Sequence, residues 1–498
     1  MNRRKVLTWS AAGLGTAIAV PAGGFGILYS TYRTDTFDDV DFDNELTVPP
    51  LAESTVKNGV RHFELDIQTG TTAFKPGGKT DTWGVNGSYL GPTVRLRRGE
   101  DASFSVRNHL DEDTTVHWHG AHLPAAVDGG PHQSIAPGDT WEAEWTADQN
   151  AATLWYHPHP HGRTARHVYR GLAGMLLIDD DISDALPLPH RYGIDDVPLI
   201  VQDRTFSSDN QFEEDSSFMN TSGIMGDEIL VNGTYGPYFS VTTKKARLRL
   251  LNASNSRVYN FGFSDDRSFQ LIATDGGLRS KPLPTERIAL SPGERAEIIV
   301  DFKEDETVDL RSFPAELGYG FPFQRFNGMD DRFDILRFKA ADSLDDSPEL
   351  PATLVDMPDL NADNPTTTRE FDLHGMNQIN NKTMDMQRID FGVRVDTTEV
   401  WTVRNRVPFL HNFHVHDVQF QVIDVDGAAP PEHLRGWKDT IALEPDLPYR
   451  LAMRFTDYTD PDLPYMYHCH ILRHEDMGMM GQFVVLGDNE DVGTVPMN

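Results

Sequence analysis

Short runs in which apolar and polar residues alternate recur along the chain, separated by Gly, Pro and Asp, and they predict half-buried β-strands. Three longer stretches resemble one another: "GPTVRLRRGEDASFSVRNHL" (91–110), "VNGTYGPYFSVTTKKARLRLLNAS" (231–254) and "MQRIDFGVRVDTTEVWTVRNRV" (386–407). Each leads into an asparagine, at Asn108, Asn252 and Asn405. This self-similarity predicts an all-β protein built from a repeated sandwich or barrel.

The spacing of the three copies predicts three β-domains, at about 45–185, 190–345 and 365–490. Two proline-rich stretches, "DALPLPHRYG" and "DDSPELPATLVDMPDLNADNP", are suitable linkers between them. The acidic segment 34–44 is expected to be a spacer ahead of the first domain.

The composition of the chain excludes some classes of partner and a disulfide framework. The chain has 76 acidic and 44 basic residues, a formal net charge of −32, so its surface repels nucleic acid and anionic membrane. A single cysteine in 498 residues excludes an intramolecular disulfide framework.

The N-terminal stretch "MNRRKVLTWSAAGLGTAIAVPAGGFGIL" places basic residues ahead of a moderately apolar run. It predicts an export signal over 1–32, with Arg3-Arg4 resembling the twin-arginine type, and an uncleaved membrane anchor is the alternative. The folded part is therefore expected in the periplasm, on the cell surface or secreted.

The chemistry of the chain is concentrated in four clusters: "HWHG" (117–120), "WYHPHPHG" (155–162), "HNFHVH" (411–416) and "HCHILRHEDMGMM" (468–480). On a strand, residues i and i+2 point to the same face about 7 Å apart, so each His-x-His pair directs two imidazoles into one volume. The middle copy has Gly262 and Ser264, or in a strict count Phe261 and Phe263, at the matching positions. The sequence therefore predicts metal ligands in the outer domains and none in the middle one.

Cys469 lies between two histidines, with His474 and Met479 following. A thiolate, two imidazoles and a weak thioether form the blue-copper ligand set, and His411 is the spare histidine of its cluster. Zinc also accepts Cys and His, but a zinc site gives no use for eight more paired histidines. Since His468 and His470 face opposite to Cys469 on a strand, the backbone here can connect two metal sites.

In this order and with these spacings, the four clusters resemble those of the multicopper oxidases, in particular the three-domain bacterial branch of exported copper-tolerance oxidases and laccases. The resemblance implies three cupredoxin-like Greek-key domains and four copper ions per chain. It assigns type 1 copper to His411, Cys469, His474 and axial Met479, and type 2 copper to His117 and His414. It assigns the type 3 ions to His119, His157 and His470 and to His159, His416 and His468.

The same resemblance implies four one-electron oxidations coupled to reduction of dioxygen to water. Asp128 and Glu475 match positions where the family places acids, and buried carboxyl groups are natural proton relays, although Asp128 could simply form a turn. His161 fits the alternation of its cluster but falls outside the ligand set, so we expect a supporting or exposed position.

The reductant is left open between Cu(I) and phenols or aromatic amines. Cuprous oxidases of this branch carry a Met-rich insert, together with acidic and thioether residues before the first "HxxHxH" ligand; here Val407 and Phe409 replace those residues. Met376, Met384 and Met386 remain, the last two expected on one strand face. In the family an axial thioether implies a moderate oxidant, better suited to Cu(I), Fe(II) or easily oxidised phenols. Asp417 stands where the family usually has glycine, without an explanation from sequence.

A role in copper tolerance is expected, with two other classes kept open. One is a laccase-type phenol oxidase without that role. The other is a non-catalytic cupredoxin protein, either structural, as in some division-associated relatives, or copper-storing. Intact ligands in all four clusters argue against the second, and a monomer is expected from family relatives. Copper nitrite reductases share the domains but lack the full set of paired histidines.

Overall fold

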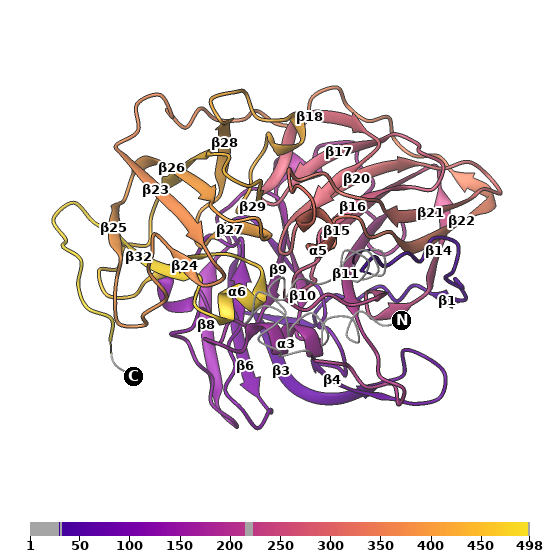
Figure 1. The fold of residues 1–498 in the computed structure, drawn as a ribbon, viewed down its shortest axis with the longest axis horizontal. Helices are drawn as coiled ribbons and strands as arrows, with labels where there is room; N and C mark the ends of the chain where they lie inside the picture. The colour runs from indigo at the N-terminus through magenta and orange to yellow at the C-terminus, as the bar shows by residue number, and fades with distance from the viewer. Residues whose placement is uncertain (1–28, 30–31, 215–222, 497–498) are drawn as a thin grey trace, which may run out of the picture.

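The computed structural model describes residues 29, 32–214 and 223–496 of the chain. In these residues β-strands form six sheets, and the helices are few and short (Figure 1). The all-β prediction is confirmed. The sheets form three pairs, each enclosing its own apolar core.

The first pair lies in the N-terminal part of the chain and encloses a core that includes Phe104, Trp118 and Leu154. One sheet has the order β2-β3-β6-β8 with β4 paired to β3, and the other has the order β5-β10-β9-β7. Their bounds are β2 (Ser54–Lys57), β3 (Val60–Thr72), β4 (Thr80–Val85), β5 (Val94–Arg97), β6 (Asp101–Asn108), β7 (His117–His119), β8 (Thr140–Thr146), β9 (Ala152–His157) and β10 (Gly174–Asp179). The helices are η2 (Ala125–Val127), α3 (Thr164–Arg170) and α4 (Asp181–Asp184).

The second pair is the largest, with sheets ordered β1-β14-β22-β21-β16-β19 and β13-β12-β11-β15-β20-β17-β18. Its strands are β1 (Asn44–Glu45), β11 (Asp196–Arg204), β12 (Glu228–Val231), β13 (Thr234–Tyr235), β14 (Pro237–Thr243), β15 (Lys245–Asn252), β16 (Tyr259–Phe263), β17 (Phe269–Thr274), β18 (Gly277–Thr285), β19 (Ile288–Leu290), β20 (Arg295–Asp301), β21 (Thr307–Ser312) and β22 (Phe333–Asp345). One short helix, α5 (Phe323–Phe326), precedes β22.

The third pair has sheets ordered β24-β23-β26-β30-β28 and β25-β32-β31-β27-β29. Its strands are β23 (Thr367–His374), β24 (Gln378–Ile379), β25 (Phe391–Arg394), β26 (Thr397–Asn405), β27 (His411–Val415), β28 (Phe420–Val425), β29 (Thr440–Leu443), β30 (Tyr449–Phe455), β31 (Tyr465–His468) and β32 (Met480–Leu486). The helices are η3 (Glu432–Leu434) and α6 (Leu472–Asp476). The domain boundaries proposed from sequence stay predictions.

The repeated asparagine has the same structural role in all three copies. Asn108, Asn252 and Asn405 each end a strand that pairs in parallel with an earlier strand of its sheet. In each, the side-chain amide nitrogen donates to a main-chain carbonyl four or five residues later, at 2.7–2.8 Å. The amide oxygen accepts the N–H two residues later. The asparagine thus organises the loop that leads to the next strand, which carries the metal-ligand candidates in the two outer copies.

The segment before the first pair of sheets was expected to be a spacer, and that expectation is wrong. Thr34 donates its N–H to Asp331 Oδ1 at 2.8 Å, and Asp35 pairs with Arg332. Strand β1 then joins β14 in parallel. Ion pairs and strand pairing with the second sandwich hold this acidic segment against it.

The predicted export segment, 1–32, lies outside the described residues except at 29 and 32. Among the described residues, the structure has no helix long and apolar enough to cross a membrane.

Candidate metal centres

Eight buried histidines meet between the first and third sandwiches. They lie on β7, β9, β27 and β31 or directly after these strands, and each is at most 1% exposed. Register brings His117 opposite His157, and His414 opposite His468. The set consists of His117, His119, His157, His159, His414, His416, His468 and His470. Rings from the two sandwiches stack, His117 on His416 at 3.9 Å and His119 on His414 at 3.8 Å between centroids.

Most of these rings turn one nitrogen outward to an oxygen of the protein. In five of them Nδ1 lies 2.7–3.2 Å from a main-chain carbonyl or a carboxylate oxygen: His117, His157, His414, His416 and His468. Since such an oxygen accepts and cannot donate, Nδ1 carries the proton and Nε2 carries the lone pair. His119 is reversed, because its Nε2 lies 3.0 Å from Asp439 Oδ1.

The inward nitrogens gather in one volume. Nε2 of His468 lies 3.1 Å from Nε2 of His416 and 3.2 Å from Nε2 of His159, and Nδ1 of His119 lies 3.4 Å from Nε2 of His157. The Nε2 atoms of His117 and His414, and both ring nitrogens of His470, are buried without a hydrogen-bond partner. Lone pairs at these distances repel one another unless a cation lies between them. The donor set therefore fits metal ions that prefer imidazole, which includes copper.

The protonation state agrees with this fit, because metal ligation requires neutral imidazole. Burial, reinforced by the neighbouring histidines, holds the pKa of most of these rings well below the usual value; these are His119, His157, His159, His416, His468 and His470.

A second group surrounds the only cysteine. Cys469 Sγ lies 3.4 Å from His411 Nδ1 and 3.7 Å from His474 Nδ1, and all three side chains are fully buried. Met479 is also buried, and its carbonyl accepts the Cys469 N–H at 3.1 Å. Burial raises the pKa of the Cys469 thiol to about 12, so a bound cation is needed to hold it as a thiolate at neutral pH. One sulfur with two imidazole nitrogens at 3.4 and 3.7 Å from it fits a copper ion.

One side chain touches both groups. Asn412 accepts the His470 N–H at 2.6 Å through Oδ1, which also lies 3.6 Å from Cys469 Sγ. Its amide nitrogen donates to Ser291 Oγ and to the Pro292 carbonyl of the second sandwich. The middle sandwich thereby holds the junction between the two groups.

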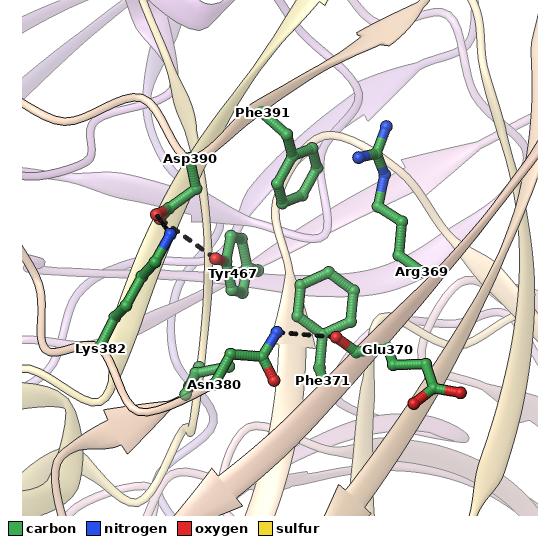
Figure 2. A pocket seen from close by; sticks show the side chains of 9 residues that line it. Arg369, Glu370, Phe371, Asn380, Lys382, Asp390, Phe391 and Tyr467 are labelled. Atoms are coloured by element: carbon green, nitrogen blue, oxygen red, sulfur yellow. Dashed lines mark hydrogen bonds and ion pairs between the residues drawn. The ribbon is translucent and has the colours of Figure 1, made fainter.

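A separate pocket of about 260 Å³ opens on the third sandwich (Figure 2). Figure 2 shows Tyr467, two residues before Cys469, directed at Asp390, to which it donates at 3.1 Å. Phe371 and Phe391 form its apolar walls. Its lining includes none of the predicted copper ligands, so the pocket is distinct from both groups.

The two predicted acids reach the histidine cluster. Asp128 Oδ2 accepts from His416 Nδ1 at 2.7 Å, and Oδ1 lies 3.4 Å from His117 Nδ1. Glu475 lies 3.4 Å from His159 Nδ1 and 3.3 Å from His468 Nδ1. Burial raises the pKa of Glu475 well above its usual value, which favours the protonated form of its carboxyl group. His161 is exposed and stands apart from the cluster.

The structure also brings in residues that sequence reasoning missed. Asp439 contacts His119, and Arg295 of the middle sandwich contacts Asp439. Both lie outside the His-x-His clusters, and no spacing pattern marks them.

Asp417 has φ +70°, a conformation that glycine adopts freely and aspartate tolerates, and it accepts from His122 Nδ1 at 2.8 Å. The expectation that Met384 and Met386 share a strand face is wrong, because the segment between β24 and β25 is irregular.

Comparison with known proteins agrees with the geometry. Models of multicopper oxidase domains match residues 66–183, 195–309 and 350–489. The chain is 38% identical over 452 residues to the multicopper oxidase mco of Staphylococcus haemolyticus, covering 89% of this chain and 92% of that one. It is also 35% identical over 446 residues to the cell division protein FtsP of Escherichia coli, covering 88% and 92%.

Among solved structures, the chain resembles CueO of Ochrobactrum sp., a laccase-like multicopper oxidase described with oxidase activity towards lignin model compounds and lignosulfonate. The TM-score is 0.80 at 35% identity, covering 89% of this chain and 100% of that one. The chain belongs to the multicopper oxidase family. It is an oxidoreductase of cupredoxin-like domains whose family uses copper, dioxygen and a reducing substrate.

Proposed function

We propose that the chain is a four-copper oxidase in which each ion is held by the ligands assigned from the sequence. His411, Cys469, His474 and Met479 hold type 1 copper. His117 and His414 hold type 2 copper through their unpartnered Nε2 atoms. The type 3 ions are held by His119, His157 and His470 and by His159, His416 and His468. The observation that carries this proposal is the set of facing, unprotonated ring nitrogens at 3.1–3.4 Å.

When bound, copper supplies one-electron transfer and the four-electron reduction of dioxygen to water. The protein holds the two groups on one chain segment: Cys469 belongs to one, and its covalent neighbours His468 and His470 belong to the other. Asn412 joins the same segment through its hydrogen bond to the His470 N–H. The bonds between Cys469 and these histidines are thus the shortest covalent route for electrons between the groups.

Asp128 and Glu475 are proposed to handle the protons that oxygen reduction consumes. Glu475 lies 3.4 Å from His159 Nδ1 and 3.3 Å from His468 Nδ1, and burial raises its pKa, which favours the protonated carboxyl group that a proton donor needs. Asp128 Oδ2 accepts from His416 Nδ1, while Oδ1 makes no hydrogen bond and lies 3.4 Å from His117 Nδ1. The two acids approach the cluster through different histidines, which gives two separate positions for proton delivery.

The reductant is proposed to be Cu(I) or an easily oxidised phenol or aromatic amine. The activity described for the Ochrobactrum relative favours the phenol. Met384 is the candidate contact for Cu(I), since the main-chain hydrogen bond from its N–H to the Gly478 carbonyl at 2.9 Å places this methionine next to the residue before Met479. A Met384→Leu variant separates the two: a Cu(I) substrate route through Met384 predicts slower Cu(I) oxidation with unchanged phenol oxidation. Met386→Leu is the matched control.

Copper tolerance, export through the twin-arginine-type segment and a monomeric state complete the proposal. The similarity to FtsP keeps a non-catalytic role in cell division as the second candidate. The retained ligands at both groups favour the oxidase, because a structural protein has no use for a buried cysteine flanked by paired histidines.

The deciding experiment uses the copper-loaded protein. Metal analysis, the visible spectrum and oxygen uptake with a phenol and with Cu(I) are measured on one preparation. About four coppers per chain, a blue colour and oxygen consumption support the oxidase. A colourless protein that binds no copper and consumes no oxygen supports the structural alternative.

A further inference from the structure

The second sandwich contributes a buried arginine to the histidine cluster, although it carries none of the proposed ligands. Arg295 begins β20 and its side chain is fully buried. It reaches the main chain of the first sandwich, where Nε donates to the Thr153 carbonyl at 2.9 Å. It also reaches the third sandwich at Asp439. One side chain therefore contacts all three sandwiches at the point where they meet.

The guanidinium group uses all five of its donors. Nη1 donates to Asp439 Oδ1 at 2.7 Å and to the Gly293 carbonyl at 3.0 Å. Nη2 donates to Asp439 Oδ2 at 2.6 Å and to the Asp275 carbonyl at 2.9 Å. Because Nε donates to the Thr153 carbonyl, every N–H of the guanidinium group has an acceptor, and the group is fixed in one orientation. The carboxylate of Asp439 is held in that plane by a bidentate pair.

Asp439 in turn determines which nitrogen of His119 is protonated. Its Oδ1 lies 3.0 Å from His119 Nε2, and its main-chain carbonyl accepts from His414 Nδ1 at 2.9 Å. Because a carboxylate bound to a guanidinium can only accept here, His119 carries its proton on Nε2 and turns Nδ1 inward. The five histidines bonded through Nδ1 turn Nε2 inward instead. His119 is thus reversed, with its Nε2 facing the Asp439 carboxylate at 3.0 Å and the Thr440 hydroxyl oxygen at 3.1 Å.

There is also no room for this arrangement to shift. Gly120 follows His119 with φ +85°, and a Cβ there would lie 2.6 Å from Asp439 Oδ2 and 2.7 Å from Arg295 Nη2. The absence of a side chain at Gly120 lets the carboxylate and guanidinium approach the strand that carries His119. The ion pair and the ligand strand are packed against each other directly.

We propose that Arg295 is a positioning residue for the copper cluster: through Asp439 it keeps His119 in the tautomer that presents Nδ1 to the metal. This inference rests on the proposed function for the metal, but the tautomer itself is a property of the copper-free chain. The middle sandwich, which lacks the metal ligands, would then act on metal binding by fixing a ligand of another sandwich. If Arg295 only links the three sandwiches, its replacement should lower the free energy of unfolding without changing the tautomer of His119.

The test compares Arg295→Met with Arg257→Met. Arg257 is the matched control because it is equally buried in the same sandwich and pairs with Asp203 and Asp331 at a distance from the histidines. Two measurements are made: the ¹⁵N chemical shifts of the histidine rings in the copper-free, ¹⁵N-histidine-labelled protein, and copper per chain with EPR after loading. The blue absorbance of the Cys469 site serves as the internal reference.

We expect the wild type and Arg257→Met to show His119 protonated at Nε2. Arg295→Met should show a mixture of tautomers and a loss of cluster copper affinity of about 10- to 100-fold, with the blue absorbance retained. Arg295→Lys keeps the positive charge but loses the planar, bidentate guanidinium group. It should therefore keep His119 protonated at Nε2 in only part of the molecules. The proposal is overturned if Arg295→Met keeps the wild-type tautomer and cluster copper.

Two outcomes separate this inference from the proposed function. If Arg295→Met does not fold, Asp439→Leu is measured in the same way, since leucine is similar in size but has no acceptor oxygen for His119 Nε2, and an unchanged His119 tautomer there rejects the proposal. If the wild type takes up no cluster copper while His119 holds its proton on Nε2, the copper function fails and the tautomer assignment stands.

Discussion

Asp128 of the first sandwich accepts a hydrogen bond from His416 of the third at 2.7 Å, across 288 residues of sequence. The ring of His117, which lies in the same sandwich as Asp128, stacks on His416 at 3.9 Å. The carboxylate orients the His416 ring, and the stacked rings join the two sandwiches at this point. The histidine cluster therefore exists only where the outer sandwiches meet, and four predictions follow from how it is built.

Cys469→Ser should abolish both the blue colour and turnover while leaving the histidine cluster able to bind copper. A hydroxyl is a poor ligand for copper compared with a thiolate, and the substitution leaves the backbone intact. Absorption spectroscopy, metal analysis and oxygen uptake on the same preparation check this. Turnover that survives without the colour would contradict the route through Cys469.

His159→Ala should lower copper content and turnover, whereas His161→Ala should leave both near wild type. The two residues belong to the same "HPHPHG" run, but His159 is buried 3.2 Å from His468 and His161 is exposed. Metal analysis of both loaded variants is the measurement. Equal copper loss in the two would mean that the ligand assignment in this run is wrong.

Gly129→Ala should destabilise the fold and weaken copper binding at His117. A Cβ at this left-handed position would overlap the Val116 carbonyl and press on the His117 backbone. Gly138→Ala is the matched control, because Gly138 has φ +85° but open space around it. Gly138→Ala should lower the free energy of unfolding by about 1 kcal/mol because of backbone strain. Gly129→Ala should lower it by about 3 kcal/mol more because of the overlap. Chemical denaturation of both variants decides, and equal losses would contradict the packing argument.

Glu475→Gln should slow turnover by about 10²-fold or more with copper content retained. The amide has the same shape but cannot take up and release a proton as a carboxyl group does, and burial favours the protonated form of that group. The effect should fall on kcat with little change in KM for the reductant, because the residue lies at the histidine cluster and not at the Cys469 site. Glu286→Gln, at an exposed position, is the control. A wild-type kcat in Glu475→Gln would exclude its proton role.

Much of the fold could be predicted from local patterns. The alternation in segments such as 101–108 became β6, with Ala102, Phe104 and Val106 buried on one face. The convergence of each i, i+2 histidine pair could also be predicted, because residues i and i+2 of a strand point to the same face. The spacer expectation is wrong because Asp35 pairs with Arg332 and Asp38 with Arg311, both far away in the chain, and charge composition alone does not reveal such partners.

The sequence alone determined the kinds of candidate ligands, their pairing along strands and the lack of His-x-His pairs in the middle copy, because these depend on residue type and on the two-residue period of a strand. Tertiary structure decided which ring nitrogen each histidine turns inward, where Asp128 and Glu475 point, and that Arg295 and Asp439 belong to the site. Those features depend on how separate sandwiches pack, and hydrogen-bond partners contributed by distant segments leave no local pattern in the chain.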